Sequence, residues 1–302
     1  MTQDRTLLGI MLMVAFCAII PIGDAMAKIL GGTVPLIQLL AVRLAFQAAI
    51  LLPIVILAKI PFRLSARHMR IVILRTAIFV GAMAAMFTAL RFLPLADAVA
   101  IAFVMPFIML LLGATMLGEE VGPRRIAACT VGFVGTLLVI QPSFVEVGLP
   151  ALLPLLVAVL FAFYMLISRQ IAQDCDPIAL QAWSGLLATP PLLLLLAFTW
   201  WKNGPVFGAV MPNMTEAVLM AGIGVFGTGA HLLMTWSLRF APSATLAPVQ
   251  YLEIPFATLY GWLIFRDLPD GLAAIGIAII IAAGLYILVR EQRLARPRPP
   301  EA

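Results

Sequence analysis

Long apolar runs recur along this chain at short intervals, and this pattern restricts its fold more than any other feature. Ten runs are separated by short segments rich in charge, proline or glycine, such as "GEEVGPRR" and "RDLPD". A run of about 20 apolar residues spans a bilayer as an α-helix, whereas the strands of a barrel would alternate. Only 11% of the residues are charged, against about a quarter in soluble proteins. The sequence therefore predicts an all-α integral membrane protein.

The ten predicted transmembrane helices are bounded by these charged and Pro/Gly-rich segments. They cover residues 6–30, 36–58, 71–91, 94–117, 123–140, 150–170, 177–201, 215–238, 242–265 and 270–289. The first run is too long for the core of a signal peptide, so we expect it to be retained as a span. Residues 290–302 form a basic, proline-containing tail that we expect to be disordered and cytoplasmic.

The distribution of Lys and Arg predicts the orientation. With a cytoplasmic amino terminus, fourteen of these residues fall on the inner side, counting Arg75, and four on the outer side. This excess fits the positive-inside rule, so both termini are expected in the cytoplasm and the chain in the inner membrane. The same topology explains the net charge of +5, and we expect no nucleic-acid partner.

An internal repeat relates the two halves of the chain. "LRFLP" at 90–94 recurs 148 positions later as "LRFAP" at 238–242, and the same offset aligns Gly113 with Gly261 and Glu119 with Asp267. Each copy holds five spans, and because five is odd the second copy enters the membrane inverted. Inverted repeats around a midplane site are typical of secondary transporters. We predict one repeat over residues 1–141, an inverted repeat over 142–289, and the tail over 290–302.

Several motifs resemble the EamA-type branch of the drug/metabolite transporter superfamily. They are Lys28 closing the first run, Arg43 in "AVRLAF", and the block over 90–120 that contains Pro106 and ends at Glu119. The second block ends at Asp267 instead of a glutamate, which keeps the charge. The resemblance covers nearly the whole chain. It implies a transporter that works by alternating access, for substrates that range from amino acids and nucleotide-related metabolites to vitamins and drugs.

Two substrate classes stay open on this basis. The chain is similar to the riboflavin transporters of the superfamily, which favours riboflavin uptake; export of amino acids or related metabolites is the alternative. An integral-membrane enzyme is less favoured, because the chain has only two histidines and three scattered cysteines. We expect no enzyme activity, no cofactor and no metal site. The expected partners are a small-molecule substrate and the lipid bilayer, and the sequence leaves the oligomeric state open.

Glu253 is the most informative polar residue, since a carboxylate near the middle of a span is costly to bury. Gln250 lies three positions before it on the same helical face, Pro248 and Pro255 bracket the pair, and Tyr251 is about 100° around the helix. We expect Glu253 to bind the substrate or to carry a coupling proton. A structural ion pair or hydrogen bond is the alternative.

The partner of Glu253 in the repeat is Met105, flanked by Phe103. One central helix thus offers a carboxylate and an amide, and the other an apolar wall. This asymmetry suits a ligand with a flat apolar part and a polar edge. Phe103, Tyr164, Tyr251 and Trp183 are candidate stacking surfaces, although ordinary helix packing explains aromatic residues as well.

Three further charged residues lie within the first two runs. Asp24 and Lys28 are four apart, in the order that favours a helical salt bridge. Arg43 has no acid in its own run, and we name Asp24 and Asp97 as partners in a clamp on the outer side, or in gating.

His231 follows Gly227 and Gly229, two glycines that permit close helix approach. Hydrogen-bonded packing is the first interpretation of this histidine. Since histidine titrates near neutral pH, His231 is also a secondary candidate for proton coupling.

Overall fold

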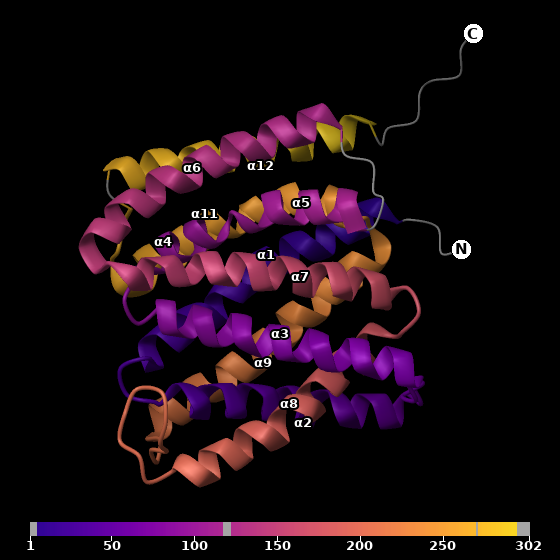
Figure 1. Cartoon of the computed structure of the whole chain (residues 1–302), viewed down its shortest axis with the longest axis vertical. Helices are drawn as coiled ribbons and strands as arrows, with labels where there is room; N and C mark the ends of the chain where they lie inside the picture. Colours follow the sequence, from indigo (N-terminus) through magenta and orange to yellow (C-terminus); the bar gives the residue numbers. More distant parts are fainter. Residues whose placement is uncertain (1–4, 117–121, 270, 295–302) are drawn as a thin grey trace.

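The computed structural model describes residues 5–116, 122–269 and 271–294, and in these ranges every regular element is helical (Figure 1). Glu119 and the last eight residues of the tail lie outside them. The α-helices are α1 (Thr6–Leu30), α2 (Leu36–Leu57), α3 (Ala66–Ala89), α4 (Leu95–Ala102), α5 (Met105–Met116), α6 (Pro123–Val147), α7 (Leu153–Ala172), α8 (Pro177–Thr199), α9 (Met214–Phe240), α10 (Ser243–Leu246), α11 (Glu253–Tyr260) and α12 (Gly271–Leu294). Short helices of other types cover η1 (Leu149–Leu152), η2 (Ala247–Leu252) and η3 (Gly261–Phe265).

The first eight predicted runs agree with eight segments of the described chain that are long and apolar enough to cross a membrane. The ninth run consists of four short helical pieces, α10 to η3, and the tenth contains a shorter apolar stretch, Gly271–Tyr286. Several boundaries differ from the prediction, above all that of the fifth run, whose helix α6 continues to Val147 instead of ending at residue 140. The third helix begins at Ala66 instead of residue 71, because the Ser65 side chain caps it by accepting a hydrogen bond from the His68 amide. The last helix continues to Leu294, into the predicted tail.

Two of the helical segments are broken at equivalent positions. The fourth segment breaks at Phe103 and Val104, between α4 and α5, and the ninth runs as a 3₁₀ helix over η2 before α11 begins. Met105 opens α5 and Glu253 opens α11, and the offset of 148 relates these two residues. Pro106 and Pro255 fall in the first turns that follow, where a missing backbone amide costs no helical hydrogen bond. The breaks therefore belong to the repeat itself.

Helix packing follows the same two-fold relation. α1 packs against α9 and α3 against α7, and the offset exchanges these two pairs. In two other pairs, α2 with α8 and α6 with α12, the offset of 148 relates one member of the pair to the other. Figure 1 shows these two pairs at opposite ends of the long axis. α4 lies against α11, as α5 lies against α10 and η2. This arrangement is the inverted repeat that the sequence predicts.

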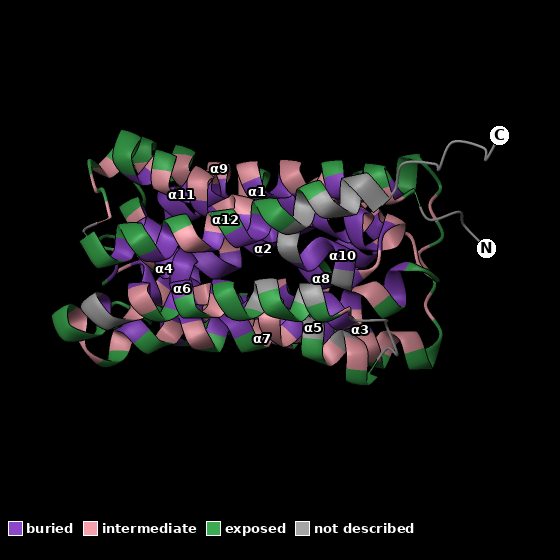
Figure 2. Cartoon of the chain, turned by 90° about the horizontal axis from the view of Figure 1, so that it is seen from above, coloured by how far each residue is buried: buried purple, intermediate pink, exposed green. Residues whose placement is uncertain are grey.

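The protein surface between the two ends is apolar, as expected of a chain in lipid. Large hydrophobic side chains such as Leu57 and Val145 are more than four-fifths exposed, and Figure 2 shows the exposed residues around a buried interior. Small residues bring helices close together inside. A Cβ atom added to Gly135 of α6 would lie 2.7 Å from the carbonyl oxygen of Gly276 of α12, so glycine permits this crossing.

Arg75 corrects the topology analysis. It lies in α3 with none of its surface exposed, so it is not a cytoplasmic loop residue. The number of Lys and Arg residues assigned to the inner side therefore falls from fourteen to thirteen. Its guanidinium donates to the hydroxyls of Ser168 (2.7 Å), Ser184 (2.7 Å) and Tyr164 (2.8 Å), and it stacks 4.5 Å from the centre of the Tyr164 ring. Because α7 and α8 provide these acceptors, a cation can be buried there and fastens three helices together.

We expect Arg75→Met to lower the free energy of unfolding by about 1–3 kcal/mol, since three buried hydroxyls lose a charged donor. Thermal unfolding of the purified protein in detergent measures this effect. Arg70→Met, on an exposed turn of the same helix, is the matched control. Equal melting temperatures for the two variants would show that the buried contacts do not stabilise the fold.

Candidate functional site: a cavity between the two repeats

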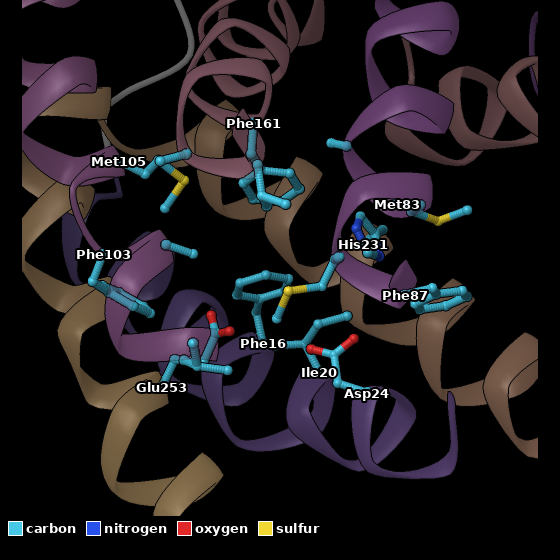
Figure 3. Close-up of a pocket in the computed structure, with 16 residues that line it drawn as sticks. Phe16, Ile20, Asp24, Met83, Phe87, Phe103, Met105, Phe161, His231 and Glu253 are labelled. Carbon is cyan, nitrogen blue, oxygen red and sulfur yellow. The ribbon is translucent and has the colours of Figure 1, made fainter. Parts of the chain in front are cut away.

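A cavity lies where the broken segments meet α1, α3, α7 and α9 (Figure 3). Its volume is about 80 Å³, within about 630 Å³ of empty space that includes open solvent. The space is therefore narrow in this conformation. Its lining residues are Phe16, Ile20, Asp24, Ala82, Met83, Met86, Phe87, Val99, Ala102, Phe103, Met105, Val157, Ala158, Phe161, His231 and Glu253.

The breaks in the helices place the two central residues of the cavity. Met105 and Glu253 each stand at the first residue after a break, in α5 and α11, and both line the cavity. Asp24 reaches it from α1, and Figure 3 shows the two carboxyl groups on either side of Phe16. Glu253 and its repeat partner Met105 thus line one cavity, and the role of Glu253 in binding the substrate or carrying a proton stays a prediction.

Four phenylalanine residues belong to the apolar wall: Phe16, Phe87, Phe103 and Phe161. The sequence analysis named only Phe103. The other three gave no signal, because a phenylalanine in an apolar run looks the same whether it packs against lipid, against a helix or against a cavity. Only the packing of α1, α3 and α7 brings their rings together.

His231 provides the third polar group of the cavity, from α9. Its Nδ1 atom lies 3.0 Å from Nη2 of Arg43 and 2.9 Å from the carbonyl oxygen of Gly227. Gly227 makes room for this guanidinium, since an added Cβ would lie 2.8 Å from Nη2, whereas Gly229 has nothing within 4 Å. We expected a helix to approach closely at both glycines. Instead, the Arg43 side chain approaches Gly227 alone.

Gln250 and Tyr251 do not line the cavity, contrary to the sequence prediction. Gln250 is fully buried, and its amide nitrogen contacts the sulfur of Met165 at 3.2 Å. The Tyr251 ring lies 5.5 Å from that of Phe103, with its hydroxyl against Gly132 of α6. Both residues belong to the 3₁₀ helix η2, and their neighbours on other helices fix them outside the cavity: Met165 of α7 contacts Gln250, and Phe103 and α6 contact Tyr251.

Tyr164 and Trp183 also lie outside the cavity lining. Tyr164 stacks on Phe79, with the ring centres 4.8 Å apart, and its hydroxyl is the acceptor for Arg75. Trp183 stacks on Phe62 at 4.4 Å and donates its indole N–H to the Phe62 carbonyl oxygen. Both rings therefore serve packing, which was the alternative interpretation.

The predicted contacts of Lys28 and Arg43 are wrong in detail. Lys28 bonds the Leu93 carbonyl oxygen at 2.6 Å and lies 4.0 Å from Asp267, so it pairs across the ends of helices instead of with Asp24. Arg43 is buried and bonds Gln47 and His231; Asp24 attracts it only at longer range, and Asp97 accepts a hydrogen bond from Ser143. Arg43 is thus part of the protein interior and not of an outer clamp.

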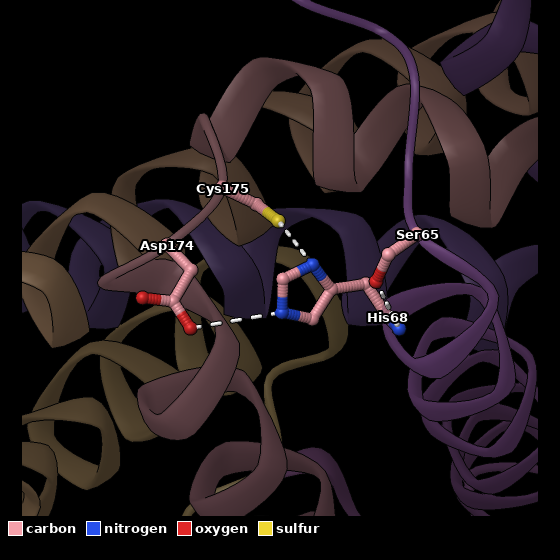
Figure 4. A network of polar contacts seen from close by, with 4 residues as sticks. All are labelled: Ser65, His68, Asp174 and Cys175. Atoms are coloured by element: carbon pink, nitrogen blue, oxygen red, sulfur yellow. Dashed lines mark hydrogen bonds and ion pairs between the residues drawn. The ribbon is translucent and has the colours of Figure 1, made fainter.

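A second group of titratable residues lies at one end of the bundle, in the first turn of α3 and the loop after α7 (Figure 4). Nε2 of His68 is 3.7 Å from Asp174, and Nδ1 is 4.0 Å from the sulfur of Cys175. Partial burial and the charge of Asp174 raise the pKa of the Cys175 thiol, which opposes formation of the reactive thiolate. This cluster connects the first turn of α3 to the loop after α7.

Within the described ranges, no group of three or more His, Cys, Asp or Glu side chains is arranged to hold a metal ion. The chemistry available in the cavity is therefore that of two carboxyl groups, one imidazole and a wall of aromatic rings. These groups can bind, orient and exchange protons with a small molecule.

Two known transporters are similar in sequence to this chain. A riboflavin transporter of Rhizobium johnstonii is 31% identical over 206 residues, covering 67% of this chain and 65% of that protein, so this chain matches slightly less than two thirds of that relative. An S-adenosylmethionine uptake transporter of Rickettsia prowazekii is 24% identical over 273 residues, covering 90% of this chain and 89% of that protein.

A protein of known crystal structure has the same fold, with a TM-score of 0.72 at 19% identity, covering 97% of this chain and 100% of that one. Residues 7–141 and 148–290 each match the EamA-like transporter family, which fits two copies of one repeat in the chain. The apolar helices, the inverted packing and this double match lead to one conclusion: the chain belongs to the EamA-like transporter family.

Proposed function

We propose that this protein is a secondary transporter of the inner membrane that takes up riboflavin by alternating access. The observation that carries the proposal is the cavity at the junction of the two inverted repeats, whose lining combines four phenylalanine rings with Asp24, Glu253 and His231. Aromatic rings can stack on a flat heterocycle, and the polar groups can hydrogen-bond its polar edge. The relative named as a riboflavin transporter supports this choice of ligand.

The position of the cavity along the helices supports alternating access. Asp24 and Phe87 lie in the carboxyl-terminal halves of α1 and α3, and Val157 and Phe161 in the amino-terminal half of α7. These halves lie toward the outer side in the predicted topology, whereas Phe16 and His231 lie just inside the helix midpoints, so the cavity extends from the middle of the bundle outward. The opposite state, in which the two repeats exchange conformations, would open the same region toward the cytoplasm. The narrow cavity is then an outward-facing or closed stage of the cycle.

Glu253 and Asp24 are the residues that we propose bind the polar part of the substrate or a coupling proton. Two carboxyl groups in one buried cavity repel each other when both are ionised, so binding a proton there is favourable. Abolished uptake in the presence of a protonophore would support coupling to protons. Uptake that persists at equal rate would indicate facilitated diffusion.

We expect Glu253→Gln to abolish riboflavin uptake, because the substitution keeps the size of the side chain and removes its charge and its proton. Uptake of labelled riboflavin is measured in a strain that cannot synthesise the vitamin, at matched membrane levels of each variant. Glu146→Gln, which alters an exposed carboxylate at the end of α6, is the control and should transport normally. Full uptake by Glu253→Gln would assign Glu253 to packing.

The same assay with the wild-type protein tests whether riboflavin is the substrate. Growth rescue and uptake support riboflavin, and excess unlabelled S-adenosylmethionine tests whether the cavity accepts the ligand named for the second relative. No uptake by well-expressed protein would refute riboflavin, and efflux of amino acids would be measured next.

We expect Phe103→Leu to raise the riboflavin concentration for half-maximal uptake about two- to tenfold, the equivalent of losing one stacking contact of about 0.5–1.5 kcal/mol. Initial uptake rates over a range of riboflavin concentrations give this value. Phe92→Leu replaces an exposed ring on the loop before α4 and should leave it unchanged. An equal effect of both substitutions would argue against stacking in the cavity.

A further inference from the structure

We infer that Arg43 is a positioning residue that keeps His231 neutral and turns its Nε2–H toward the cavity. His231 then serves as a fixed hydrogen-bond donor to an uncharged polar edge of the substrate, such as a ring carbonyl oxygen, and not as a proton carrier. The part that concerns the substrate rests on the proposed function; the charge and tautomer of His231 do not.

Arg43 is held in place on all sides. It is 2% exposed, its Nη1 atom donates to Gln47 at 2.9 Å, and Gln47 is itself fixed by the Gln181 carbonyl oxygen at 2.7 Å. The guanidinium carbon lies 5.1 Å from the centre of the Phe79 ring. With these contacts made, Nη2 reaches Nδ1 of His231 at 3.0 Å.

The chemistry of a guanidinium decides which nitrogen of His231 carries the proton. Arginine stays charged and only donates hydrogen bonds, so Nδ1 accepts and the single proton of a neutral ring lies on Nε2. The Gly227 carbonyl oxygen, 2.9 Å from Nδ1, would accept from the opposite tautomer. A proton on Nδ1 would, however, lie beside the positively charged guanidinium of Arg43, 3.0 Å away. Because Arg43 carries a full charge and Gly227 only a carbonyl dipole, the tautomer with its proton on Nε2 is favoured.

A second proton on the ring would be opposed from several helices. It would place two positive charges 3.0 Å apart at Arg43, and the charge of Arg75 on α3 acts in the same direction. Tyr164 and the rings of Phe16, Phe79 and Phe161 surround the imidazole with ring centres 4.7–6.3 Å away. Asp24 and Glu253 line the same cavity and favour a cation, but His231 makes no ion pair with either among the described contacts.

Gly227 provides the space that this arrangement needs. A Cβ there would meet Nη2, Nε and the guanidinium carbon of Arg43 at 2.8–3.0 Å, so Gly227→Ala has to displace the guanidinium. Gly229 lies two residues on and has nothing within 4 Å. The pair Gly227→Ala and Gly229→Ala therefore moves Arg43 in one variant and leaves it in place in the other, without changing a charge.

The chain has two histidines, which makes a direct measurement practical. Protein labelled with ¹⁵N-histidine in lipid bilayers gives one pair of imidazole nitrogen signals for each histidine, and His68→Gln assigns the two pairs. We expect His231 to be neutral with its proton on Nε2 throughout the range in which histidine ordinarily titrates, about pH 5 to 8. An imidazolium within that range, or a neutral ring protonated on Nδ1, would overturn the inference.

The variants test whether Arg43 is the cause. Arg43→Met and Gly227→Ala should change the tautomer or the protonation of His231, and Gly229→Ala should not. Arg43→Lys, which keeps a positive charge but not the planar donor, separates the effect of charge from that of geometry. An unchanged His231 spectrum in folded Arg43→Met protein would remove the positioning role.

Transport gives a second readout. We expect wild-type uptake to show no pH dependence from His231, and Arg43→Met to raise the half-saturating riboflavin concentration about tenfold, the loss of one buried hydrogen bond. Any new pH dependence in Arg43→Met should be absent from the double variant with His231→Gln. If riboflavin is not carried at all, the proposed substrate fails while the spectra still decide the state of His231.

Discussion

Polar groups buried within a bilayer have no water to bind, so each has to find its partner inside the protein. This constraint shapes one side of the molecule. Arg43, Gln47 and Gln181 form a chain of hydrogen bonds that joins α2 to α8, and Gln181 continues it to Thr235 of α9 and to Tyr164. Arg75 completes it through α3, α7 and α8. Five helices are thereby fastened by polar contacts, in a region where apolar packing alone gives little specificity.

The broken segments lie on the other side of the cavity and differ in character. Their contacts are mainly apolar, and each contains a point where regular α-helical hydrogen bonding stops, before Met105 and before Glu253. Helical breaks at membrane depth are tolerated where protein or a cavity surrounds them. The candidate site thus lies between a part that polar contacts fasten and a part whose helices are interrupted.

The two repeats share a fold but not their chemistry, and this difference defines the candidate site. Equivalent positions carry Met105 in one repeat and Glu253 in the other, so symmetry positions the site while sequence divergence makes it one-sided. His231 adds to this asymmetry as a polar lining residue from α9, and Arg43 of α2 orients its imidazole. A symmetric scaffold with an asymmetric lining can change conformation by exchange of its halves and still hold a ligand in one orientation.

The sequence alone determined the class, the helical segments and the inverted repeat, because lipid imposes a length and a composition on every span and because Arg, Pro and acidic residues recur in one register. It also identified Glu253, since a carboxylate in an apolar run is conspicuous. Tertiary structure decided which neighbours line the cavity: it packed Gln250 against Met165 and Tyr251 against Phe103, outside the lining, and added Phe16 and Phe161. Side-chain partners such as those of Arg43 depend on which helices meet, and local spacing does not contain that information.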